Sequence, residues 1–336
     1  MVTEKRLRIG LVIDGTDHFI RPIEAALRKR HRIARFAPRF VRFPIVGKRL
    51  NDWLLVHQLG SFLRTNDVVF FEWAGPLAAL SSSLSGQARR IVRAHRTELF
   101  SDLGMFRWTG IDRVVFVSNA MRSRFVEMFP DWKEKAVVVP NGVDLQRFSF
   151  DVKPFTGRIC ILGNLIPRKR AYDLICALAD LPDHLQWQLI VGGAPVSSDL
   201  DYWEALKGLV KRARLGDKIV FAGQVGDVAA WLGQMDVFIS ASYSEGQQVA
   251  LLEAMASGCY CLGHCWDGIE EILPPDNIYV TDSELRAKLI RYAALSDEAR
   301  HALQAQMRTI TEEKFDERRM VSQIVDLIEQ VARESL

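Results

Sequence analysis

Two glutamates, Glu245 and Glu253, stand eight residues apart in the segment 236–258, DVFISASYSEGQQVALLEAMASG. The apolar run Val237–Ser240 predicts a strand, followed by a small polar loop and, from about Gln247, a helix. Glu245 then lies in the loop and Glu253 about two turns into the helix. In parallel α/β sheets, ligands bind outside the carboxyl ends of the strands, at the N-termini of the following helices. We therefore expect both carboxylates and the free helix N–H groups to face one crevice.

The basic segment GNLIPRKR, residues 163–170, is a second candidate. We expect a strand to end at Gly163, a short loop to follow, and Lys169 to open the next helix. Lysine, arginine and helix N-termini can hold phosphate groups without a metal. A basic run is unfavourable beside the positive end of a helix dipole, so a bound anion would explain it. A solvated basic turn is the alternative interpretation.

Regular secondary structure must position these two segments. The sequence pattern predicts such structure along the whole chain. Short apolar strands alternate with helical segments, the pattern of a doubly wound parallel α/β sheet. The segment VPNGVD at 139–144 interrupts the alternation, because Pro, Asn and Gly favour a turn. We expect two Rossmann-like domains, 1–142 and 143–315, with a cleft between them. A C-terminal helix in 316–336 is expected to pack back on the first domain. The expected strands are Leu7–Ile13, Val68–Phe71, Arg90–Arg93, Val114–Val117, Ala136–Val139, Arg158–Leu162, Trp187–Val191, Ile219–Ala222, Val237–Ser240 and Cys259–Leu262.

Composition sets the broad class. A chain of 336 residues with 49% hydrophobic and 25% charged residues suits two globular domains. It has no apolar run long enough to span a bilayer, and MVTEKRLRIG lacks the apolar segment of a signal peptide. Five cysteines, an odd number, favour reduced thiols. We therefore expect a cytoplasmic protein.

Basic residues are concentrated near the N-terminus. Residues 1–50 hold thirteen Lys or Arg and four Asp or Glu, whereas the whole chain has a net charge of +3. Within 28–53, Arg32, Arg35, Arg39, Arg42, Lys48 and Arg49 alternate with Phe36, Phe40, Phe43 and Trp53. This pattern suits peripheral contact with an anionic membrane surface. A nucleic-acid patch and a solvated basic face are the alternatives.

The motifs together resemble the GT-B glycosyltransferases, in particular family 4, whose retaining members carry an E-x7-E signature. The resemblance is best over 113–280. The frame S-x-x-E-G-x6-E-A-M-A-x-G is matched at Ser242, Glu245, Gly246, Glu253, Ala254, Met255, Ala256 and Gly258. The segment at 163–170 is similar to the family's G-R-L-x-x-x-K-G, with Lys169 in register. Asn164 stands where the family has arginine, so Arg168 or Arg170 would have to supply the second cation.

The resemblance implies a role for each matching residue. Lys169 would hold the donor diphosphate, Glu253 the donor ribose and Glu245 the donor sugar. His95 resembles the histidine of the family's R-x-H, which contacts donor sugar and acceptor, and Glu98 lies beside it. The remaining expected donor contacts are Gly163, Asn164, Arg168, Arg170, Gly246, Gln247, Gln248 and Val249. In the loop after the first strand, the residues expected to face the acceptor cleft are Gly15, Asp17 and His18.

The resemblance implies a retaining, metal-independent transferase without a cofactor. It would move a hexose-type sugar from a nucleotide-diphosphate sugar to a glycan or lipid-linked acceptor, at the inner face of the cell membrane. No nucleic-acid partner is expected. Asp199-Leu200-Asp201 matches D-x-D but suits a helix N-cap, and Cys259–Cys265 suits a buried strand better than a metal cluster. The alternative is a catalytically silent GT-B scaffold that binds nucleotide or glycan as a regulatory or assembly subunit.

Overall fold

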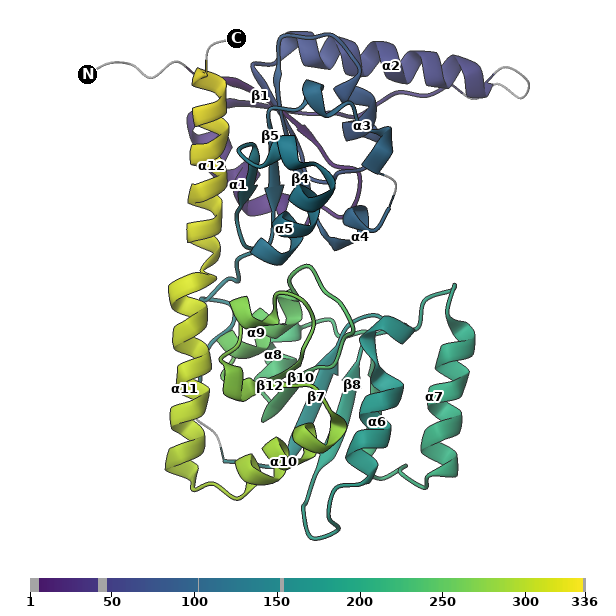
Figure 1. Ribbon diagram of the computed structural model, residues 1–336, viewed down its shortest axis with the longest axis vertical. Coiled ribbons are helices and arrows are strands. Elements are labelled where there is room, and N and C mark those ends of the chain that lie inside the picture. The colour runs from purple at the N-terminus through teal and green to yellow at the C-terminus, as the bar shows by residue number, and fades with distance from the viewer. Residues whose placement is uncertain (1–5, 42–46, 102, 152–153, 335–336) are drawn as a thin grey trace. The chain divides into compact units, whose positions relative to one another are not determined.

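The computed structural model describes residues 6–41, 47–101, 103–151 and 154–334. By its contacts the chain divides into two compact units (Figure 1). Unit 1 comprises Met1–Asn141 with Arg318–Leu336, and unit 2 comprises Gly142–Glu317. The division between Asn141 and Gly142 falls within the Pro-Asn-Gly segment that interrupts the sequence pattern.

Unit 1 is built on a six-stranded parallel sheet of order β2-β1-β3-β4-β5-β6. Its core strands are apolar and buried on both faces, as expected when helices cover both sides of a parallel sheet. The strands are β1 (Arg8–Val12), β2 (Arg32–Arg35), β3 (Val68–Phe71), β4 (Arg89–Ala94), β5 (Arg113–Phe116) and β6 (Ala136–Val138). The helices are α1 (Ile20–Arg30), α2 (Gly47–Thr65), α3 (Pro76–Ser82), α4 (Arg96–Leu99), α5 (Asn119–Met128) and α12 (Glu317–Arg333).

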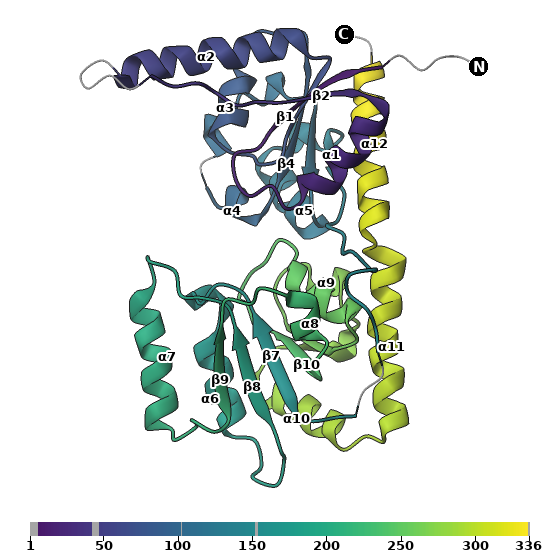
Figure 2. The same cartoon turned by 180° about the vertical axis from the view of Figure 1, so that it is seen from behind.

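Helix α12 completes unit 1 from the other end of the sequence. Its apolar stripe, which includes Ile324 and Ile328, packs in one core with Ile9 of β1 and Phe70 of β3. Glu329 on the same helix accepts a hydrogen bond from His31 Nε2 at 2.8 Å. Figure 2 shows the helix lying beside α1 and β1. The last helix therefore belongs to the first sheet.

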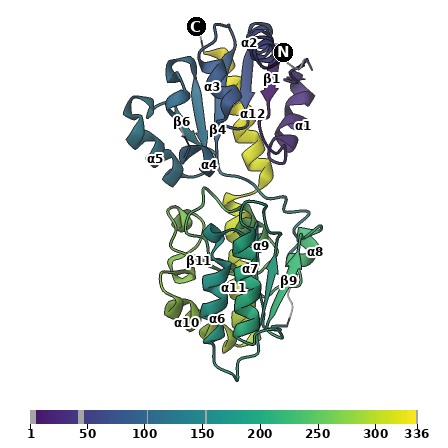
Figure 3. The same ribbon diagram turned by 90° about the vertical axis from the view of Figure 1, so that its right-hand side faces the viewer.

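Unit 2 has a second six-stranded parallel sheet, of order β12-β11-β10-β7-β8-β9. One core under α6, α7 and α10 includes Ile159 and Ile239, and the other, under α8, α9 and α11, includes Cys160 and Phe238 (Figure 3). The strands are β7 (Arg158–Leu162), β8 (Gln188–Gly192), β9 (Ile219–Gly223), β10 (Val237–Ser240), β11 (Tyr260–His264) and β12 (Ile278–Tyr279). The helices are α6 (Ala171–Ala179), α7 (Leu200–Arg212), α8 (Val228–Leu232), α9 (Val249–Ala256), α10 (Asp282–Ala293) and α11 (Asp297–Lys314).

Two doubly wound parallel sheets confirm the predicted fold class. In each sheet the strand order reverses direction at one place, between β1 and β3 in unit 1 and between β7 and β10 in unit 2. Crevices for ligands open at such switch points, outside the carboxyl ends of the strands. The loops that follow β7 and β10 hold the basic segment and Glu245, so both sequence motifs meet at the switch point of unit 2.

Candidate functional site

Glu245 is the centre of a charged cluster at the switch point of unit 2. Its side chain is 9% exposed, and its Oε1 atom accepts hydrogen bonds from Lys169 Nζ at 2.5 Å and from Ser242 Oγ at 2.6 Å. Arg168 lies 2.9 Å from the same oxygen. Burial acts to raise the pKa of Glu245, but the charges of Lys169 and Arg168 outweigh it and the pKa is lowered. Glu245 is therefore held as a carboxylate between two cations.

The loop after β7 is shaped to deliver these cations. Gly163 adopts φ +151°, and a side chain there would come within 3.3 Å of Lys169 Cε, so glycine leaves room for the lysine. Pro167 then begins a single 3₁₀ turn, Pro167–Lys169. The prediction that Lys169 opens the next helix is wrong. Arg170 adopts a left-handed conformation with φ 55°, which separates the turn from α6.

Arg168 and Arg170 point to different surroundings. Arg168 donates a hydrogen bond to Ser244 O at 2.6 Å and stays in the Glu245 cluster. The Arg170 guanidinium stacks on the Tyr243 ring, 4.9 Å from its centroid, and lies 3.7 Å from Asp282. Of the two arginines, Arg168 is therefore the one placed beside Lys169.

Helix α9 begins two residues later than predicted. Gln248 is its N-cap, with an extended ψ of 103°, so Glu253 is the fifth residue of the helix rather than two turns inside it. Burial raises the pKa of Glu253 to about 7, against the opposing charge of Arg147. Glu253 is therefore a mostly buried carboxyl group that titrates near neutral pH, which distinguishes it from Glu245.

The Gln248 side chain belongs to a buried chain of hydrogen bonds. It is 6% exposed, and its Oε1 accepts a hydrogen bond from Ser240 Oγ, which in turn accepts one from Trp266 Nε1 at 3.1 Å. This buried chain ties the start of α9 to β10. Its neighbours Gly246, Gln247 and Val249 are buried or half-buried.

A pocket connects the two loops of unit 2. Its lining comes from the ends of β7 and β10 and includes Gly163, Asn164, Lys169, Ser242 and Gln248. The structure thus brings the predicted basic segment and the start of the glutamate motif to one pocket. Asn164 itself is exposed.

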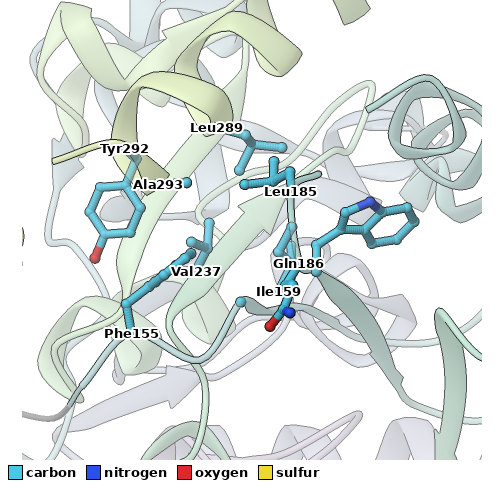
Figure 4. Close-up of a pocket in the computed structure, with 10 residues that line it drawn as sticks. Phe155, Ile159, Leu185, Gln186, Val237, Leu289, Tyr292 and Ala293 are labelled. Atoms are coloured by element: carbon cyan, nitrogen blue, oxygen red, sulfur yellow. The ribbon is translucent and has the colours of Figure 1, made fainter. Parts of the chain in front are cut away.

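A second, apolar pocket lies at the opposite edge of the same sheet, where β7 and β10 begin (Figure 4). It is lined by Phe155, Ile159, Val237, Leu289 and Tyr292, among others. None of the predicted site residues lines it.

In unit 1, the loop after β1 lies against Trp73, the second residue after β3. Gly15 is exposed, and a Cβ atom there would come within 2.7 Å of Trp73 Cε2. Trp73 Nε1 donates a hydrogen bond to Thr16 O at 3.2 Å. Asp17 is engaged by Arg21 at 2.8 Å, whose hydrogen bond lowers its pKa, and His18 is exposed. These residues surround the switch point of the first sheet.

His95 follows β4 immediately and is the N-cap of α4. Its ring packs against Trp73 in a tilted arrangement and stacks on Phe19, with centroids 4.3 Å and 5.3 Å away. Its Nε2 atom lies 3.3 Å from Oε1 of Glu72, a fully buried carboxylate. Glu98, three residues on, is 7% exposed, and burial raises its pKa. His95 and Glu98 are thus neighbours at the same edge of the sheet.

Sequence reasoning missed Glu72 and Arg93, which are fully buried. Arg93 NH1 lies 3.3 Å from Glu72 Oε1, and its NH2 donates to Asn141 Oδ1 at 2.8 Å. Glu72 directly follows the apolar strand β3, VVFF, and Arg93 follows the apolar pair Ile91-Val92 within β4. A charge inside such a run is the signal that could have revealed them, because isolated buried charges are costly.

Several predictions concern features that the described residues do not test. That His95 and Glu98 share a cleft with Glu245 stays a prediction, because they belong to different units. In the part of the chain that the structure describes, no three His, Cys, Asp or Glu side chains are grouped as metal ligands.

Asp199 is the N-cap residue of α7, as the sequence suggests. Its carboxylate accepts a hydrogen bond from Ser198 Oγ and makes no capping hydrogen bond to the helix. No described helix has the length and hydropathy to cross a membrane.

Comparison with known proteins identifies the family. Residues 156–294 match the model of "Glycosyl transferases group 1", and residues 16–147 match that of "Glycosyltransferase Family 4". A lipopolysaccharide core biosynthesis mannosyltransferase of Rhizobium leguminosarum is 35% identical over 77 residues, which cover 23% of this chain and 22% of the relative. One from Rhizobium meliloti is 30% identical over 137 residues, 36% of this chain and 38% of the relative. The alignments thus span well under two thirds of these relatives.

Solved structures share the architecture of the whole chain. HepE of Anabaena, in complex with UDP and glucose, has a TM-score of 0.77 at 16% identity, covering 97% of this chain and 100% of that one. A glycosyltransferase from Rickettsia africae has a TM-score of 0.79 at 16% identity, covering 98% and 100%. The same family is indicated by the two parallel sheets, by the E-x7-E motif at a switch point and by the two family matches. The chain belongs to the GT-B glycosyltransferases of the family 4 type.

Proposed function

We propose that this protein is a retaining, metal-independent glycosyltransferase. It transfers a hexose-type sugar from a nucleotide-diphosphate sugar to a hydroxyl group of a glycan or lipid-linked acceptor. The observation that carries the proposal is the convergence of Lys169, Arg168 and Glu245 at the switch point of unit 2. Two cations on one carboxylate leave one positive charge in surplus, which suits a diphosphate.

Arg168 supplies the second cation that Asn164 lacks. It reaches Glu245 from the 3₁₀ turn, whereas Arg170 is engaged by Tyr243 and Asp282. This arrangement weakens the case for a silent scaffold, which the replacement of the family arginine by Asn164 would otherwise favour. In our proposal, Lys169 and Arg168 stabilise the charge that develops on the leaving phosphate.

Glu253 holds the donor ribose. A carboxylate accepts hydrogen bonds from two vicinal hydroxyl groups, and Glu253 is a mostly buried carboxyl with a raised pKa and a weakly opposing Arg147. Binding of the hydroxyl groups stabilises the charged form. The transfer then proceeds on one face of the sugar. The acceptor oxygen bonds to the anomeric carbon as the bond to the phosphate oxygen breaks, and the acceptor proton passes to that phosphate.

The relatives support the substrate classes. Two are named as lipopolysaccharide core mannosyltransferases, and a third, of Streptococcus pneumoniae, as alpha-monoglucosyldiacylglycerol synthase. HepE has been solved with UDP-glucose as well as with UDP. These names favour a sugar donor linked to a nucleoside diphosphate and an acceptor attached to a lipid. In this proposal, His95 and Glu98 of unit 1 contact the acceptor.

We also propose that α2, together with Phe40, contacts an anionic membrane at its cytoplasmic face. Phe40 is 56% and Trp53 59% exposed, and Lys48 and Arg49 are exposed at the start of the helix. Exposed aromatics beside cations suit the headgroup region. Arg35 contributes less to the attraction for an anionic membrane than its charge implies, because it forms an ion pair with Glu24. Arg42 and Phe43 lie outside the described residues.

The test is turnover with defined donors. The full chain is incubated with UDP-glucose or GDP-mannose and a bacterial glycolipid acceptor, and the anomeric configuration of the product is read by NMR. We expect an α-linked product from an α-linked donor, without added metal and in the presence of a chelator. Lys169→Met should abolish turnover.

The matched control is Lys207→Met. Lys207 also pairs with a glutamate, Glu204, at 2.7 Å, but on the exposed surface of α7. Its loss should leave turnover unchanged. Nucleotide binding without sugar transfer to any acceptor would favour the silent scaffold, and a β-linked product would exclude the retaining mechanism.

A further inference from the structure

We infer that Glu72 is a positioning residue that fixes the tautomer of His95, so that the imidazole meets a sugar hydroxyl through Nδ1. This inference rests on the proposed function, because it concerns how unit 1 presents His95 to substrate. It assigns a purpose to the buried pair Glu72–Arg93, which the transfer chemistry does not otherwise use.

The His95 ring is held in one plane by its neighbours. Phe19 stacks against it with an interplanar angle of 28°, and Trp73 packs against it in a tilted arrangement at 35°. The stacking fixes the plane but does not choose which nitrogen carries the proton. Within the described residues, the hydrogen bond of the ring is the one from Nε2 to Glu72 Oε1, at 3.3 Å.

The shared oxygen of Glu72 chooses the tautomer. Arg93 NH1, which can only donate, lies 3.3 Å from Glu72 Oε1 and is itself fully buried, so this oxygen acts as an acceptor. The proton of the hydrogen bond between Glu72 and His95 is therefore on Nε2. Nδ1 keeps its lone pair and can accept a hydrogen bond from a hydroxyl group.

Arg93 is anchored so that it cannot leave Glu72. Its second nitrogen donates to Asn141 Oδ1 at 2.8 Å, and its guanidinium lies 5.8 Å from the Phe19 ring centroid. Asn141 is the last residue of the first segment of unit 1. The buried Arg93 thus connects Asn141, where the first segment of unit 1 ends, to the carboxyl group that orients His95.

A second histidine–glutamate pair shows what a purely structural pair looks like here. His31 Nε2, at the C-terminal end of α1, lies 2.8 Å from Glu329 Oε1 of α12. The Nδ1 atom of His31 is buried without a partner. His95 Nδ1 is not among the buried unpartnered atoms of the described residues, and the side chain is 11% exposed. His95 is therefore the one of these two rings with a nitrogen open to a ligand.

The experiment is NMR of the full chain with 15N-labelled imidazole rings. We expect His95 to show a slowly exchanging Nε2–H signal and an unprotonated Nδ1. In the double variant Glu72→Met/Arg93→Met, which removes both buried charges together, the protected signal should disappear. The His31 signal serves as the internal control, because loss of both signals would report unfolding. If unfolding occurs, the tautomer of His95 in the wild-type protein, read from the 15N shifts of its Nδ1 and Nε2, decides the question.

Ligand titrations then identify the hydroxyl. UDP, UDP-glucose and methyl α-mannoside are added separately, and the Nδ1 shift is followed. A response to UDP-glucose but not to UDP places a donor-sugar hydroxyl at His95, and a response to the free mannoside places an acceptor hydroxyl there. No response to either sugar overturns the inference, as does a His95 that carries its proton on Nδ1.

Activity separates this inference from the proposed function. A variant that loses the protected Nε2–H should lose about tenfold in kcat, the effect of one hydrogen bond, with little change in KM for the nucleotide sugar. An inactive wild-type protein whose His95 still shows the Glu72-bound tautomer would refute the proposed function and leave the tautomer assignment standing.

Discussion

Glu253→Gln should make the ligand-free protein more stable at pH 8. Burial raises the pKa of Glu253 from 4.5 to about 7. Below the unfolded-state pKa of 4.5 the side chain is protonated in both states, so its contribution to stability is fully present. As pH rises through 7, the folded protein must ionise a buried group, and that contribution is lost.

The magnitude follows from the shift. A difference of about 2.5 pKa units at 1.36 kcal/mol each is on the order of 3 kcal/mol lost by the wild-type protein at pH 8. Glutamine does not titrate and keeps a similar shape, so Glu253→Gln avoids the loss. For a domain of the size of unit 2, Gly142–Glu317, a gain of this magnitude in the free energy of unfolding corresponds to a rise in Tm of roughly 6–12 °C. At pH 5 the difference between the two proteins should be small.

Thermal unfolding of both proteins between pH 5 and pH 8 measures the effect, and Glu245→Gln is the matched control. The pKa of Glu245 is lowered in the folded state, so its contribution is present above the unfolded-state value and lost as pH falls. Glu245→Gln should therefore destabilise at pH 8, the opposite sign. Equal or lower stability of Glu253→Gln at pH 8 would refute the reasoning that Glu253 carries an uncompensated charge.

Three further outcomes are expected. Arg168→Met should weaken nucleotide binding about tenfold, as loss of a charge-assisted hydrogen bond does, whereas Arg170→Met should not; calorimetry distinguishes them. Glu329→Ala should lower the free energy of unfolding by about 1–3 kcal/mol, because buried His31 loses its acceptor, and urea denaturation measures this. The double variant Phe40→Ser/Trp53→Ser should bind anionic vesicles less tightly in a flotation assay with Tm unchanged, since both side chains are exposed; undiminished binding would remove the membrane proposal.

The sequence was most informative where strands are buried and turns carry glycine or proline. β10 begins and ends as predicted, and Gly258 adopts the positive φ of 75° expected of a helix C-cap. Each such feature depends on a local rule, the length of an apolar run or the freedom of one glycine. The loop that carries Glu245 could therefore be placed from sequence.

Features that depend on tertiary context could not be placed in this way. β2 was missed because it is an edge strand with exposed Arg32 and Arg35, and it has no apolar run. The start of α6 was misplaced because Arg170 adopts a conformation that usually requires glycine. Which arginine joins Glu245 depends on the direction of a 3₁₀ turn, and spacing does not encode that direction.

The buried pair Glu72–Arg93 was missed for a related reason. Charged residues at strand ends are common in exposed positions, so the sequence signal is weak. The packing of Phe19, Trp73 and Asn141 around the pair shows that it is enclosed. The ion pair between Glu72 and Arg93 offsets the cost of burying both charges. The pair forms because β3 and β4 are neighbours in the sheet, and the sequence does not state that order.

The most direct test of a nucleotide-sugar site in unit 2 is thermal stability with UDP, GDP, ADP and CMP, for the wild type and for Glu253→Ala. At a hundred times the dissociation constant, a bound nucleotide adds about 2.7 kcal/mol to the free energy of unfolding. We predict a clear rise in Tm with one nucleoside diphosphate, and no rise with that nucleotide for Glu253→Ala. A wild-type Tm that none of the four nucleotides raises would contradict the central claim.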